Sequence, residues 1–434
     1  MAPITNQRNA PFTVGVALDG AGWHPAAWRE PGARPGELFT AAYWQSLAER
    51  AEQTGLDYLT IDDSLQLRAS GPFDRQVPPR PQAGRAEGRL DALLIASWVA
   101  PHTERIGLIP TVTTTHTEPF HVATALQTLD HISLGRAGWQ LRFSATAAEA
   151  AAFGRRPAPE IDIEAVLTSR PDAGLDELLD DAAAVAETAR RLWDSWEDDA
   201  IIRDVASGRF LDRERLHHIN FDSEHFSVVG PSIVPRSPQG QLPVTLLAHS
   251  PRIFELAARA ADVVFITPGN DSPAAGASRG KSVAELVAEV RAAEFAEHRD
   301  GTGLEPLRIV ADLVVAFDTE TESAEARLQR LDGLAGAPYV GDARIAAGSA
   351  GEIAKLIEEW HAQGAEGVRL RPLAIPADLD AIGAELLPLL RDRVPGYSND
   401  ETGESASLRE RFELPAAVNR YTVERIAARE ERVA

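Results

Sequence analysis

The chain of 434 residues contains no cysteine, which narrows the chemistry open to it. Without thiols the protein forms no disulfide, thiolate nucleophile, iron–sulfur cluster or cysteine-ligated zinc site. It also lacks an apolar run of about 18 residues that could cross a membrane. Its first residues lack the basic patch and apolar run of a secretory signal. We therefore expect a cytoplasmic protein whose chemistry depends on other polar side chains or on a cofactor.

Basic residues are fewer than acidic residues in this chain. Lys and Arg number 43 against 65 Asp and Glu, which gives a net charge of −22. Such a chain repels polyanions, so we expect neither nucleic acid nor an anionic membrane as a partner. A small anionic molecule can still bind in a local pocket of backbone amides and arginines.

Two common motifs are also missing. No Gly-x-Gly-x-x-Gly follows a predicted strand, which disfavours a Rossmann domain. The first strand has no His-x-His, and the helical spacings of His116, His121 and His131 place successive residues off a common face. We therefore predict no metal site.

Apolar runs of strand length alternate with segments of helical periodicity through most of the chain. The predicted strands are residues 12–18, 58–61, 105–110, 137–143, 243–247, 263–267, 307–317 and 367–371. The predicted helices are residues 38–54, 90–102, 119–132, 176–196, 253–261, 282–298, 323–334 and 350–363. Eight such units favour a closed (β/α)₈ TIM barrel of the α/β class over an open doubly wound sheet.

We expect one domain spanning residues 1–434, with insertions at the C-terminal face of the barrel. The insertions are predicted near residues 65–89, 145–240 and 270–281, and a tail starts at about residue 396. The charged end of this tail, residues 400–434, is expected at the surface or in a subunit contact.

Polar residues follow several predicted strands, where barrels of this kind carry their sites. Asp62 and Asp63 follow the second strand, but adjacent strand residues face opposite ways, and either could instead cap a helix. The third strand is followed by Thr111, Thr113, Thr114, Thr115 and His116, although threonine also favours strands for steric reasons. Gln140 lies on the fourth strand, where an inward amide could bind a ring with donors and acceptors.

His249 and Ser250 stand between the fifth strand and its helix, followed by Pro251 and Arg252. Backbone amides at a helix N-terminus bind phosphate readily, and Ser250 and Arg252 strengthen that interpretation. Ser250 is equally an ordinary N-cap with Pro251 at the first helical position. Both interpretations are compatible.

Residues 129–144, LDHISLGRAGWQLRFS, closely resemble the LDHLSxGRAGWNxVTS signature of bacterial-luciferase-like flavin monooxygenases. The branch concerned contains nitrilotriacetate, long-chain alkane and dibenzothiophene sulfone monooxygenases. Four further segments agree: GAGWHPAAWREP, TIDDSL, RLWDSW and SLRERFELPAAVNRY. The resemblance implies a barrel that takes reduced FMN from a separate NAD(P)H:flavin reductase and uses O₂ to oxygenate a small organic substrate. It also suggests a homodimer or homotetramer.

Carried over by position, the resemblance implies flavin-ring contacts at Asp63, Thr115 and Gln140. His249 and Ser250 fall on the phosphate-binding loop. His116 and Thr117 stand where some alkane-oxidising relatives have Tyr and a catalytic His, which makes them the candidates near the substrate. Two alternatives stay open: a deazaflavin-dependent dehydrogenase of the same superfamily, or a flavin-binding protein that has lost turnover.

Overall fold

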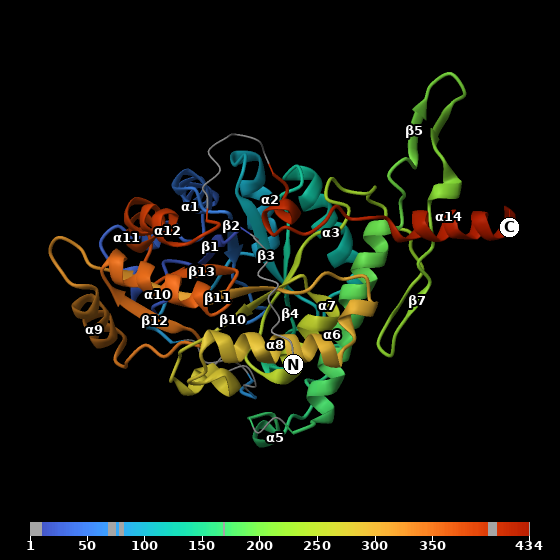
Figure 1. Ribbon diagram of the computed structural model, residues 1–434. Helices are drawn as coiled ribbons and strands as arrows, with labels where there is room; N and C mark the ends of the chain where they lie inside the picture. Colours follow the sequence, from blue (N-terminus) through green and yellow to red (C-terminus); the bar gives the residue numbers. More distant parts are fainter. Residues whose placement is uncertain (1–10, 68–74, 78–81, 168–169, 398–405, 434) are drawn as a thin grey trace.

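The computed structural model describes residues 11–67, 75–77, 82–167, 170–397 and 406–433, and its centre is a closed barrel of parallel strands (Figure 1). In order around the barrel the strands are β1 (Thr13–Leu18), β2 (Tyr58–Ile61), β3 (Gly107–Thr113), β4 (Trp139–Arg142), β9 (Val244–Leu247), β10 (Val263–Ile266), β11 (Arg308–Phe317) and β13 (Gly367–Pro372). Pairing of β13 with β1 closes the ring. The eight predicted strands and the (β/α)₈ fold are therefore confirmed.

Helices surround the strands. They are α1 (Ala41–Thr54), α2 (Ala92–Val99), α3 (Pro119–Ile132), α6 (Ala173–Asp194), α7 (Pro251–Ala260), α8 (Val283–Ala296), α9 (Ala324–Ala335), α10 (Ala350–Ala362), and α11 (Ala377–Ala381) followed by α12 (Leu387–Arg393). Because the helices cover the outside and side chains fill the inside, every residue of β1, β10, β11 and β13 is buried. A strand that the sequence did not predict, β12 (Arg344–Gly348), pairs with β11 outside the ring.

Local sequence signals fix the helix ends. The side chain of Thr40 accepts from the N–H of Tyr43 to begin α1, and Gly55 ends it with a φ of 87°. Ser282 and Ser349 form capping boxes with glutamates three residues later. The boundaries predicted from periodicity were within three residues for α1, and matched α3 at both ends.

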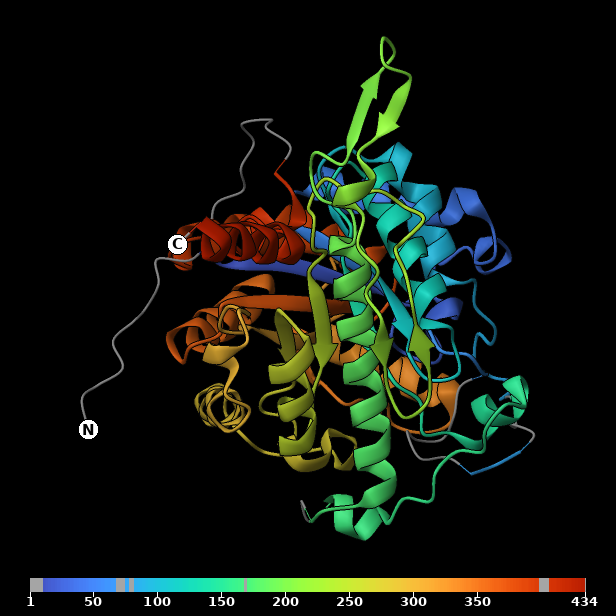
Figure 2. The same cartoon turned by 90° about the vertical axis from the view of Figure 1, so that its right-hand side faces the viewer.

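Helix α6 divides the predicted 145–240 insertion between the two ends of the barrel. The part before α6 includes α4 (Ala147–Phe153) and α5 (Ile163–Leu167) and follows the C-terminal end of β4. The part after α6 precedes β9 and forms two hairpins, β5 (Ile201–Asp204) with β6 (Arg209–Leu211), and β7 (Phe221–Asp222) with β8 (Ser227–Val228). Figure 2 shows the first hairpin and α5 at opposite ends of α6.

The C-terminal tail closes the bottom of the barrel. Leu408 and Phe412, at and beyond the short helix α13 (Leu408–Arg411), are fully buried and pack against Tyr58 and Phe265. The expectation of a surface tail is thus wrong for this segment, because its apolar side chains, although they stand among many charged residues, fill the floor of the barrel. Helix α14 (Arg420–Val433) projects from the body (Figure 1). None of the helices in the described ranges combines the length and apolar character needed to span a bilayer.

Candidate functional site at the C-terminal mouth of the barrel

A layer of buried polar groups crosses the barrel interior below its C-terminal mouth. Arg369 on β13 donates through Nε and Nη2 to the carboxylate of Asp312 on β11, at 2.7 and 2.5 Å. Its Nη1 donates to Oε1 of Gln140 at 2.5 Å. The guanidinium lies 3.7 Å from the ring centroid of Phe265. Gln140, a predicted flavin contact, therefore faces the barrel interior with its amide oxygen already engaged.

Arg371 extends this layer toward the loop before α7. It bridges Asp312 and Asp342, and its Nη1 donates to Asp342 Oδ1 at 2.6 Å. Burial opposes the charged form of Arg371, but the two carboxylates outweigh it and raise the pKa of the guanidinium. The His249 ring lies between Asp342, 3.3 Å from Nε2, and Thr267, whose hydroxyl is 3.0 Å from Nδ1. His249 is thus held by this network.

The sequence reasoning missed Asp312, Asp342, Arg369 and Arg371. A signal was present in β13, GVRLRP, where two arginines stand two residues apart and must share one face of the strand. Charged side chains on an interior face need partners, which the sequence alone does not locate.

Asp63 is a carboxylate held by backbone amides. Its Oδ1 accepts from the N–H of Ser64 at 2.7 Å, and its Oδ2 accepts from Ala92, the first residue of α2, at 2.9 Å. Burial raises the pKa of Asp63 to about 6, and the two amides and Arg89 oppose that shift. Its neighbour Asp62 pairs with Arg89 at 3.2 Å. The cap interpretation and a site role therefore both fit Asp63.

The three candidates after β3 differ in their freedom to bind a ligand. Thr115 is buried and its hydroxyl accepts from the N–H of Ser144 at 3.0 Å. The Thr117 hydroxyl donates to backbone carbonyls of the preceding turn, the nearer of which is 2.7 Å away. His116 has a φ of 70° and stacks on Phe153 with 5.5 Å between ring centroids. Neither of its buried ring nitrogens has a hydrogen-bond partner among the described residues. Burial lowers the pKa of His116, so its neutral ring retains hydrogen-bonding capacity for a ligand.

At the N-terminus of α7 a phosphate could bind to one hydroxyl and to backbone amides, but proline leaves fewer free amides there than most helices have. Ser250 is the N-cap, but its side chain makes no capping hydrogen bond. Pro251 has no N–H, and the amides of Ile253 and Phe254 both donate to the Ser250 carbonyl. Arg252 is paired with the carboxylates of Asp176 and Glu255. The Ser250 hydroxyl therefore fits the predicted phosphate role, whereas Arg252 is engaged elsewhere.

Further polar groups near Gln140 bear on whether the mouth of the barrel could hold a flavin ring. Thr111 and Thr245 flank Gln140 in register on β3 and β9, and both hydroxyls are buried with no hydrogen-bond partner in the part of the chain that the structure describes. The polar groups around Gln140 and at His116 can therefore still donate and accept hydrogen bonds. This capacity matches the edge of a flavin ring, which carries both donors and acceptors. No group of three or more His, Asp or Glu side chains placed to hold a metal ion occurs within the described ranges.

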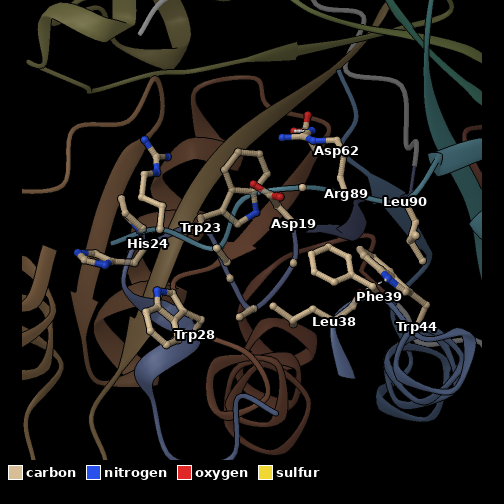
Figure 3. Close-up of a pocket in the computed structure, with 17 residues that line it drawn as sticks. Asp19, Trp23, His24, Trp28, Leu38, Phe39, Trp44, Asp62, Arg89 and Leu90 are labelled. Carbon is tan, nitrogen blue, oxygen red and sulfur yellow. Dashed lines mark hydrogen bonds and ion pairs between the residues drawn. The ribbon is translucent and has the colours of Figure 1, made fainter. Parts of the chain in front are cut away.

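A cavity that is partly open to solvent lies beside these groups, between the loop after β1 and the segment before α2 (Figure 3). It is lined by Asp19, Gly20, Ala21, Gly22, Trp23, His24, Pro25, Trp28, Leu38, Phe39, Trp44, Asp62, Arg85, Ala86, Gly88, Arg89 and Leu90. None of the seven predicted site residues is among them. The guanidinium of Arg371 lies 4.4 Å from the ring centroid of Trp23, so the polar layer abuts the cavity wall.

Comparisons with known proteins agree with this architecture. The chain is 29% identical to N-acetyl-S-(2-succino)cysteine monooxygenase of Bacillus subtilis (strain 168), over 94% of this chain and 98% of that protein. It is 36% identical to nitrilotriacetate monooxygenase component A of Aminobacter aminovorans, over 59% of this chain, and the matched region spans 54% of that relative.

Solved structures share the fold. EDTA monooxygenase from Chelativorans sp. BNC1 superposes with a TM-score of 0.72 at 22% identity, covering 94% of this chain and 99% of that one. A riboflavin lyase with modified FMN and riboflavin gives a TM-score of 0.73 at 22% identity, covering 93% of this chain and 95% of that one. The model of the luciferase-like monooxygenase family matches residues 21–384. This match confirms the resemblance seen in the signature around Gln140, and the chain belongs to the luciferase-like monooxygenases.

Proposed function

We propose that this protein is the oxygenase component of a two-component system. It takes reduced FMN from a separate NAD(P)H:flavin reductase and uses O₂ to oxygenate a small organic substrate. The main support for this proposal is the family match over residues 21–384, together with the curated relatives of this chain, which are named monooxygenases. When bound, reduced FMN supplies the oxygen chemistry, so the protein needs no nucleophile or metal of its own.

The residues of the mouth divide into groups with different tasks in this proposal. Ser250 binds the FMN phosphate through its free hydroxyl and the start of α7. Asp63 and the amide nitrogen of Gln140 bind the polar edge of the ring, and Thr115 fixes the loop beside it through Ser144. His249 acts through Asp342 and Thr267 to hold the phosphate loop in position.

His116 and Thr117 are proposed on the substrate side. The unpartnered nitrogens of His116 can accept or donate one hydrogen bond to the molecule being oxidised. Thr117 holds the turn that carries His116, since its hydroxyl is bonded to that turn's carbonyls. The aromatic wall of the neighbouring cavity excludes water from the reacting groups.

Reconstitution tests the proposal directly. The purified protein is combined with FMN, a flavin reductase and NADH, and O₂ uptake and substrate oxygenation are followed together. We expect FMN to bind at micromolar protein and oxygenated product to form only when all components are present. Absence of FMN binding under these conditions would refute the assignment.

A deazaflavin-dependent dehydrogenase is the second candidate. It is supported by the fold likeness to an F420-dependent tetrahydromethanopterin reductase from Methanopyrus kandleri, with a TM-score of 0.56 at 16% identity over 87% of this chain and 99% of that one. That enzyme class transfers hydride without consuming O₂, so an oxygen electrode separates the two candidates. Flavin binding with neither activity would instead indicate a protein that has lost turnover.

The proposal includes two properties of the working enzyme. It places the reaction in the cytoplasm, where NAD(P)H is regenerated for the reductase. It also includes a homodimer or homotetramer, supported by exposed apolar side chains near the first hairpin and α14, such as Val205, Phe210 and Ile426.

A further inference from the structure

The cavity after β1 is separate from the proposed flavin contacts. The proposed FMN contacts come from the ends of β2, β3, β4 and β9, and none of them lines the cavity. The cavity also adjoins the polar layer through Trp23, which stacks under Arg371. A ligand bound here would lie next to the proposed flavin site.

The apolar wall of the cavity offers ring faces. The indole N–H of Trp23 donates to the Ala17 carbonyl at 2.9 Å, that of Trp28 to Gly84 at 3.0 Å, and that of Trp44 to Leu38 at 3.1 Å. Because each N–H is already satisfied by backbone, these side chains are held in position and present mainly their aromatic surfaces to a ligand. A flat apolar group matches such a wall.

Among the charged side chains that line the cavity, one cation has no partner in the described residues. Asp62 is paired with Arg89, and Asp19 also has an interaction outside this pair. Arg85 makes no side-chain hydrogen bond or ion pair with any described residue, and its Nε is buried without a partner. Arg85 is half-buried and lines the cavity, and a planar carboxylate matches the fork of donors that a guanidinium presents.

His24 does not compete for that anion. Its Nδ1 accepts from the N–H of Ala26 and its Nε2 donates to Asp332 at 3.1 Å, so both nitrogens are engaged. Burial lowers the pKa of His24, and the ring is neutral near pH 7. Arg85 is therefore the cation that the described residues leave available.

We propose that this cavity is the substrate pocket and that it selects a flat, aromatic organic carboxylate, whose anionic group pairs with Arg85 while its ring lies against Trp23, Trp28 and Trp44. The inference rests on the proposed function for the identity of the ligand as substrate. It adds the substrate class and a specificity-determining residue, Arg85.

Calorimetric titration of the flavin-free protein tests this with two matched probes, naphthalene-2-carboxylate and its neutral isostere naphthalene-2-carboxamide. We expect the carboxylate to bind about tenfold to a hundredfold more tightly, as for one charge-assisted hydrogen-bonded pair. Arg85→Gln should abolish the preference while leaving carboxamide affinity unchanged, and Arg85→Lys should retain part of it. Arg29→Gln is the control, because Arg29 stacks on Trp28 at 4.8 Å but does not line the cavity.

Several results would overturn the inference: failure of both probes to bind, equal affinity for acid and amide, or a preference that survives Arg85→Gln. Displacement of the carboxylate by oxidised FMN would assign the cavity to the flavin instead, and would also overturn it. Because these titrations need no flavin, their outcome is separate from that of the FMN-binding test. The probe could bind as expected even if the proposed monooxygenase activity were absent, and the reverse also holds.

Discussion

Replacing Asp312 with asparagine should destabilise the protein strongly, because this carboxylate is the anion shared by two buried arginines. Asp312 is fully buried, and Arg369 and Arg371 are at most 2% exposed. Asparagine keeps the shape but removes the charge, so Arg369 would lose its carboxylate partner and Arg371 would keep Asp342 alone. Breaking a buried pair in this way costs about 3–5 kcal/mol.

Urea unfolding followed by circular dichroism measures the effect. For a chain of this length, 3–5 kcal/mol corresponds to a midpoint shift on the order of 1 M urea. Asp62→Asn is the matched control, because the Asp62–Arg89 pair is partly exposed, at 32% and 18%, and should contribute no more than about 1 kcal/mol. Equal midpoint shifts for the two variants would show that the interior layer does not bear the stability we assign to it.

A second variant separates charge from packing. In Asp312→Leu combined with Arg369→Met, one buried ion pair is replaced by apolar groups of similar size, and Arg371 keeps Asp342. Such replacements are often neutral or stabilising. We therefore expect the double variant to recover most of the stability lost in Asp312→Asn. A double variant less stable than Asp312→Asn would contradict the electrostatic reasoning.

Four further predictions concern binding, turnover and assembly. Ser250→Ala should weaken FMN binding about tenfold in a fluorescence titration, and an unchanged affinity would remove Ser250 from the phosphate site. FMN affinity should fall as the pH falls through about 6, because protonation of Asp63 removes its negative charge, and Asp63→Asn should flatten that profile. His116→Ala should lower turnover about a hundredfold with FMN affinity unchanged; a loss of FMN binding instead would place His116 at the flavin. Phe210→Asp with Ile426→Glu should reduce the mass measured by light scattering, and an unaltered mass would exclude this surface from assembly.

The barrel was predictable because its strands are buried on both faces and so appear in the sequence as apolar runs. Strand β12 escaped notice because it lies outside the ring, and its residues are only partly buried or exposed, so it does not form an apolar run. The burial of Leu408 and Phe412 was hidden among charges, since the barrel floor they fill is formed by strands far away in the sequence. Period and propensity locate elements, but they do not say which surface an isolated apolar side chain will meet.

The candidate site was predictable only where chemistry follows directly after a strand. Asp63 and Thr115 became candidates in this way, and Gln140 became one from its place on β4. Arg369, by contrast, meets Asp312 and Gln140 across 57 and 229 residues of sequence. The cavity could not be predicted for the same reason, because it forms where two segments far apart in the sequence meet. The segment carrying Arg85 meets the loop after β1 through the bond between Trp28 and Gly84, which are 56 residues apart.

Arg371 connects the two halves of the mouth, and its position explains why they are arranged as one unit. On one side it shares Asp342 with His249, next to the proposed phosphate loop. On the other side it stacks on Trp23, a wall of the proposed substrate pocket. Because β13, which carries Arg371, is buried and paired on both sides, it gives the proposed flavin and substrate sites a rigid common support. The proposed reaction requires flavin and substrate to be held together with their geometry fixed. Arg371 contributes to that geometry, because it contacts Trp23 directly and reaches His249 through Asp342.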